Sequence, residues 1–102
     1  MRTTNDLTKL EANASVVAKM LKLLANEQRA CILFHLMAAR GDVAVGTIAT
    51  STRIGQSALS QHLAKLRESG VIASRRVGHR FFYRIVDTKT ILLLDALKDI
   101  NR

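Results

Sequence analysis

The chain has 102 residues, the usual size of one domain and too short for a doubly wound sheet, a TIM barrel or two separate cores. Hydrophobic residues make up 48% of it, which is enough for a packed core and excludes a disordered tail. Sixteen basic residues against eight acidic ones give a net charge of +8, and this excess favours a phosphate-rich partner, either nucleic acid or an anionic membrane surface. The single cysteine excludes an intramolecular disulfide framework.

The hydrophobic residues are not arranged to cross or enter a membrane. No run approaches 18 uninterrupted apolar residues, and the first six residues lack the apolar segment of a signal peptide. We therefore expect no membrane partner and a cytoplasmic location.

The positive charge is concentrated in one stretch of the chain. Residues 53–84 hold seven basic residues and one acidic residue, a net charge of +6, whereas residues 1–52 contribute +2 and residues 85–102 are neutral. No linker rich in glycine, proline or serine separates these parts. The sequence predicts a single domain over 1–102 whose phosphate-binding surface lies in residues 53–84.

Three helices are predicted before this basic stretch. The first covers residues 7–24, where apolar residues recur at alternating spacings of three and four and form a narrow seam suited to helix–helix contact. Asn26 is expected to cap the second helix and Gly41 to supply its left-handed terminal residue. A short third helix is expected over residues 45–51, with Val45, Ile48 and Ala49 facing inward.

A helix-turn-helix is predicted next. Ile54 and Gly55 form a tight turn, and residues 56–67 form a helix with leucines on one face and amide and hydroxyl groups on the other. Two β-rich runs, 71–76 and 81–86, flank a glycine-containing turn and predict a hairpin, the wing of a winged helix. The aromatic residues 81–83 suggest a stacking platform for single strands, but adjacent strand residues point to opposite faces. At least one of the three therefore belongs to the core, and Tyr83 is expected to pack on the recognition unit.

A last helix is predicted from Asp87, which caps it, to about residue 100. Its exposed leucines, like the seam of the first helix, predict a partner surface that a second copy of the chain would cover. The predicted dimer interface consists of Leu7, Leu10, Ala14, Val17, Leu21, Ile91, Leu94 and Leu97.

Several motifs together resemble the ArsR/SmtB family of bacterial winged-helix repressors. They are LLANEQR at 23–29, SALSQHLAKLR at 57–67, GVI at 70–72, the arginine pair at 75–76 and FY at 82–83. The resemblance covers roughly residues 14–100 and is greatest to the metal-independent, NolR-like branch. It implies a mainly α fold with a β-hairpin, ordered α-α-α-α-β-β-α, that dimerises through its first and last helices.

The expected DNA partner is double-stranded, with the polar helix face reading base edges and the surrounding cations holding phosphates. Two assignments are left open: His62 either touches phosphate or packs beneath its helix, and about half of the strand arginines face away from DNA. The predicted DNA contacts are Gln56, Ser57, Ser60, Gln61, His62, Lys65, Arg67, Arg75, Arg76, His79 and Arg80.

Metal sensing, common in the family, lacks its ligands here. Ala44 and Gly46 occupy the cysteine positions of one family site, and no histidine follows Asp87 where a second site needs one. We therefore expect no metal and no cofactor. Cys31 and His35, spaced four apart, leave a ligand-responsive sensor as the alternative.

Three other classes are less well supported. The family's dithiol redox members carry one cysteine where this chain has Phe34 and another near the C-terminus, where residues 85–102 have none. No nucleophile–base pair or glycine-rich phosphate loop indicates an enzyme. A structural nucleoid-type DNA binder would not need so many amide and hydroxyl groups on its binding face. The sequence therefore predicts a homodimeric repressor that binds an operator of two-fold or near-two-fold symmetry; the small molecule that would induce it is unknown.

Overall fold

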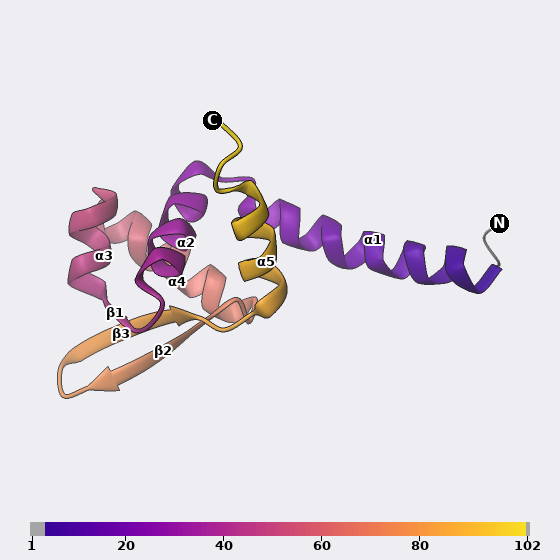
Figure 1. The fold of residues 1–102 in the computed structure, drawn as a ribbon. Coiled ribbons are helices and arrows are strands. Elements are labelled where there is room, and N and C mark those ends of the chain that lie inside the picture. Colours follow the sequence, from indigo (N-terminus) through magenta and orange to yellow (C-terminus); the bar gives the residue numbers. More distant parts are fainter. Residues whose placement is uncertain (1–3, 102) are drawn as a thin grey trace.

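A computed structural model describes residues 4–101 of the chain (Figure 1). Residues 1–3 and 102 lie outside the described residues. The prediction of a single domain included all four of them, and the signal-peptide argument used residues 1–3. The elements, in chain order, are α1 (Thr4–Leu24), α2 (Glu27–Ala39), β1 (Val43–Ala44), α3 (Val45–Thr52), α4 (Gln56–Glu68), β2 (Ile72–Val77), β3 (Arg80–Ile85) and α5 (Thr88–Leu97). The predicted winged helix-turn-helix order is confirmed, with one short strand added to it.

That added strand, β1, completes a three-stranded antiparallel sheet in the order β1-β3-β2. Val43 pairs with Tyr83 and Ala44 with Phe82, so the loop after α2 is fastened to the base of the wing. The hairpin itself runs in register from the Ile72–Ile85 pair to the Val77–Arg80 pair. Two residues cannot form a recognisable sequence pattern, which explains why β1 was not predicted.

The core lies between α2, α3, α4 and the inner face of the sheet. Its most deeply buried members are Ile32, Leu33, Leu36, Ile48, Leu66 and Leu94. The leucines of α4 alternate with polar residues at helical spacing, so this helix buries one side and exposes the other. In the part of the chain that the structure describes, no helix is both long enough and apolar enough to cross a membrane.

Gly41 does not supply the left-handed residue that was expected at the end of α2. Arg40, with φ 56°, takes this conformation in place of Gly41, and Arg53, with φ 60°, takes it at the end of α3. The Arg40 N–H donates to the Leu36 and Met37 carbonyls at 3.3 Å, and the Arg53 N–H donates to the Ala49 carbonyl at 2.9 Å. The hydrogen bonds to these helix-end carbonyls determine which residue takes the left-handed conformation. In a residue other than glycine this conformation costs about 1–2 kcal/mol.

Helix α1 projects away from the rest of the molecule, and only its C-terminal end joins the core (Figure 1). Leu23 is buried, whereas the seam residues Leu7, Leu10, Val17 and Leu21 are exposed, as the prediction of a partner surface requires. The α1–α2 junction is fixed by Asn26, whose side chain accepts from the Arg29 N–H as predicted.

Helix α5 begins as predicted but buries more than predicted. Asp87 Oδ2 accepts a hydrogen bond from the Thr90 N–H at 3.3 Å and another from the Thr90 hydroxyl at 2.6 Å. Leu94 is 2% exposed and packs in the core of its own domain, so its assignment to the dimer interface is wrong. Thr90 and Leu94, which are one helical turn apart, form the side of α5 that packs against the body. Ile91, which is exposed, and Leu97, which is half-buried, remain on the outer surface.

Candidate nucleic-acid interface

The helix-turn-helix is held in place by a short network at its turn. The Thr52 hydroxyl donates to the Ile48 carbonyl at 2.7 Å, and the Ile54 N–H donates back to that hydroxyl at 3.4 Å. Ile54 is 7% exposed and inserts into the core. These contacts fix the angle at which α4 leaves α3, and so fix the direction of its polar face.

The polar face of α4 points into solvent. Leu59, Leu63 and Leu66 are buried beneath the helix. The predicted base-reading residues Gln56, Ser57, Ser60 and Gln61 are all exposed. Among the described residues, none of these four side chains is occupied by a hydrogen bond, so their amide and hydroxyl groups are open to a ligand. A helix held rigidly from below and open on its outer side is suited to the major groove.

His62 lies on the side of α4 that faces α2. Its Nε2 is 2.8 Å from Oε1 of Gln28, and with the amide oxygen as acceptor the histidine donates. Burial, followed by the nearby Arg29 charge, lowers the pKa of His62, which favours the neutral ring. Of the two roles left open by the sequence, the geometry favours packing beneath the helix. Gln28, which sequence reasoning missed, is 34 residues away.

Both ends of α4 are suited to phosphate. Gly55 caps its N-terminus without a side-chain hydrogen bond, which leaves N–H groups of the first turn open to an anion. Lys65 and Arg67 lie in the last turn and are exposed. Arg67 Nη1 also donates to Ser74 Oγ at 3.4 Å, and this contact links α4 to β2.

The outer half of the wing is an exposed, cationic hairpin. The turn at Gly78, with φ 62°, and His79 carries Arg76 and Arg80 at its two sides. The Arg76 guanidinium lies 5.7 Å from the Phe81 ring centre, and its Nε donates to the Gly78 carbonyl at 2.8 Å. Arg80 lies 5.3 Å from the ring centre of Phe82. Cation–π contacts of this kind restrict the arginine side chains while leaving their charges exposed.

The three adjacent aromatic residues divide between surface and core, although Phe81 and Tyr83 lie on the same face of β3. Phe81 is exposed, whereas Tyr83 packs against the core cluster. Guanidinium groups lie over the rings of Phe81 and Phe82. A stacking platform for single-stranded bases is therefore disfavoured, because arginines already cover the rings.

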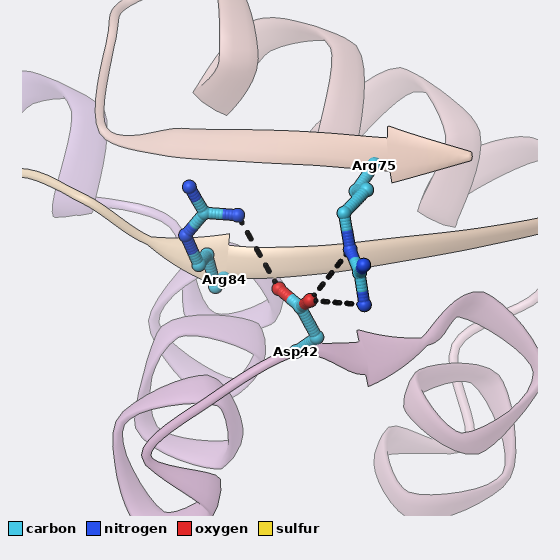
Figure 2. Close-up of polar contacts among 3 residues, drawn as sticks. All are labelled: Asp42, Arg75 and Arg84. Carbon is cyan, nitrogen blue, oxygen red and sulfur yellow. Dashed lines mark hydrogen bonds and ion pairs between the residues drawn. The ribbon is translucent and has the colours of Figure 1, made fainter. Parts of the chain in front are cut away.

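Asp42 joins two arginines of the wing, a contact that sequence reasoning missed (Figure 2). Its Oδ2 accepts from Nε and from Nη2 of Arg75, each at 2.9 Å, and its Oδ1 accepts from Nη1 of Arg84 at 3.4 Å. Arg75 is thus ion-paired within the protein, unlike the other arginines predicted to contact DNA. Asp42 and Arg75 are 33 positions apart in the sequence, so no local pattern indicated this pair.

Cys31 and His35 are neighbours on α2, with Sγ 3.7 Å from Nδ1. Nδ1 is also 2.9 Å from the Cys31 carbonyl, a local contact within one helical turn. Within residues 4–101 no group of three or more histidine, cysteine, aspartate or glutamate side chains could hold a metal ion. The pair therefore lacks the further ligands that a metal site needs.

Comparison with known proteins identifies the fold and the class. The profile of the family described as "Bacterial regulatory protein, arsR family" matches residues 26–74. The biofilm growth-associated repressor of Xylella fastidiosa is 37% identical over 91 residues, covering 89% of this chain and 78% of the relative. The nodulation protein NolR of Rhizobium meliloti is 36% identical over 88 residues, covering 86% and 70%.

A solved structure agrees with the sequence relatives. The crystal structure of the transcriptional repressor BigR from Xylella fastidiosa superposes with a TM-score of 0.85 at 36% identity, covering 93% of this chain and 95% of that one. The fold and the exposed helix face define a winged helix-turn-helix DNA-binding regulator. The chain belongs to the ArsR family of bacterial transcriptional regulators.

Proposed function

We propose that this chain is a homodimeric repressor in the cytoplasm that binds a two-fold or near-two-fold symmetric operator in double-stranded DNA. The observation that carries the proposal is the exposed row of amide and hydroxyl groups on α4, above leucines buried in the core. Glutamine pairs through two hydrogen bonds with adenine in the major groove, which makes Gln56 and Gln61 the main candidates for reading sequence. Ser57 and Ser60 would supply further contacts to base edges or phosphates.

The cations around this row would supply affinity and orientation. Lys65 and Arg67 at the end of α4, and Arg76, His79 and Arg80 on the wing, are exposed. Each phosphate contact releases close to one counterion without reading sequence. The overall charge of +8 supports a binding energy with a large salt-dependent part. His62 acts instead by holding α4 on α2.

Dimerisation would set the symmetry of the operator. The exposed seam of α1 and the outer residues Ile91 and Leu97 of α5 are the proposed interface. A two-fold dimer places two recognition helices about 34–36 Å apart, one turn of DNA. Repression follows from occupying such a site, and the Xylella relative is named a repressor.

Selection from a random duplex DNA library by the purified full chain tests the proposal. We expect an enriched site made of two inverted half-sites whose centres lie about 10–10.5 base pairs apart. The Gln56→Ala and Gln61→Ala double variant should recover a weaker consensus, with Glu11→Gln, on the distant α1, as a control that recovers the wild-type site. Recovery of no consensus by the wild type would contradict the proposal.

A further inference from the structure

The carboxylate of Asp42 contacts an arginine on each strand of the wing (Figure 2). Asp42 immediately precedes β1, Arg84 is on β3 and Arg75 is on β2. Its side chain is 23% exposed, whereas those of Arg75 and Arg84 are 59% and 46% exposed. The acid is thus the more enclosed partner, and the two cations lie over it.

This cluster lies on the face of the sheet opposite α4. Tyr83 and Ile85 pack on the core, so Arg84 between them points the other way. Ser74, the partner of Tyr83 in the ladder, receives the hydrogen bond from Arg67 of α4, which places α4 on the core side. Arg75 therefore shares the outer face with Arg84, in agreement with their common contact to Asp42.

The charges of the wing are divided by this arrangement. Arg75 and Arg84 share one carboxylate, whereas Arg76 and Arg80 make no ion pair within the range that the structure covers. A phosphate that recruited Arg75 would have to compete with two short hydrogen bonds and would approach the carboxylate of Asp42 itself. Partly exposed ion pairs contribute little to folding stability, so an effect of Asp42 is expected mainly on ligand binding.

We propose that Asp42 is a positioning residue that withholds the charges of Arg75 and Arg84 from DNA phosphates and so limits sequence-independent binding by the wing. The inference rests on the proposed DNA-binding function and deepens it. It assigns phosphate contact to the tip of the hairpin and excludes Arg75, which the sequence had placed among the DNA contacts. The arginines of the wing that contact phosphates are then Arg76 and Arg80.

The test measures the affinity of Asp42→Asn for random-sequence duplex DNA over a salt series. Asp42→Asn releases both arginines, and one new phosphate contact by Arg75 in each protomer of a dimer adds about 2 to the slope of log affinity against log salt. Random DNA then binds about 3- to 10-fold more tightly at low salt. Asp95→Asn is the matched control, because it removes the same charge and frees Lys98, which lies 2.9 Å from Asp95 on another part of the surface. The control should change the slope by less than half as much.

A second variant keeps the proposal testable if Asp42→Asn folds poorly. In a protein that keeps Asp42, Arg75→Ala should have the same salt slope as the wild type, whereas Arg76→Ala should have a lower one. An unchanged slope in folded Asp42→Asn, or an equal loss of slope in Arg75→Ala and Arg76→Ala, would overturn the role of Asp42. Failure of the wild type to bind any duplex would instead overturn the proposed function, and this inference with it.

Discussion

The exposed seam of α1 gives a quantitative prediction for dimerisation. Leu10 and Leu21 expose 42% and 48% of their surface. Full burial of a leucine contributes about 1.5–3 kcal/mol, so covering the exposed part of each contributes about 1 kcal/mol. A two-fold dimer contains four such side chains. In the double variant Leu10→Ala/Leu21→Ala, the four alanine methyl groups of the dimer keep part of this contact. The variant should therefore weaken dimerisation by about 3 kcal/mol, or about 100-fold.

Sedimentation velocity over a wide protein concentration series measures this change. Alanine is the best helix former, so the helix content seen by circular dichroism should not fall in the variant. Lys9→Ala, on a side of α1 away from the seam, should leave the dimerisation constant as it is in the wild type. A wild type that is monomeric at micromolar concentration, or a double variant that dimerises as tightly as the wild type, would refute the reasoning.

Three further predictions concern the core and the two histidine sites. Because burial lowers the pKa of His62 in the folded state, the unfolded chain takes up its proton first as the pH falls below about 6.5, so the free energy of unfolding should decrease there. Denaturant titrations should show less of this decrease in His62→Gln, and an equal decrease would contradict the assignment. Leu66→Ala, at a site that is 0% exposed, should cost about 2–5 kcal/mol of unfolding free energy, and a loss below about 1 kcal/mol would place it outside the core. Chelator treatment and Cys31→Ser should both leave operator affinity unchanged in anisotropy titrations, whereas a metal- or oxidant-dependent shift would favour the sensor alternative.

Long, regular elements could be predicted from the sequence because their patterns are local. The leucines of α4 recur at helical spacing, and the cap residues Asn26 and Asp87 identify the starts of α2 and α5. The exposed face of α4 followed directly, since the residues opposite a buried stripe point to solvent. Leu94 was misassigned because apolar residues occur on several sides of α5, and the sequence does not tell which side faces the body.

The contacts that position the site are non-local, and so they were missed. Gln28 holds His62 across 34 residues and Asp42 holds Arg75 across 33, distances that only the folded chain closes. The turns show the same limit on a smaller scale. Arg40 takes the left-handed conformation expected of Gly41, because its N–H satisfies the carbonyls of Leu36 and Met37 at the end of α2.

The division of work between α4 and the wing is the central claim, and one comparison of Gln61→Ala with Arg76→Ala tests it most directly. Both variants are titrated against the selected operator and against random duplex DNA over a salt series. Gln61→Ala should lose about 1–3 kcal/mol per half-site on the operator, with little change on random DNA. Arg76→Ala should weaken both DNAs alike and lower the salt slope by about 1 for each phosphate contact removed. An equal loss on both DNAs in Gln61→Ala, or a changed sequence preference with an intact salt slope in Arg76→Ala, would contradict the account.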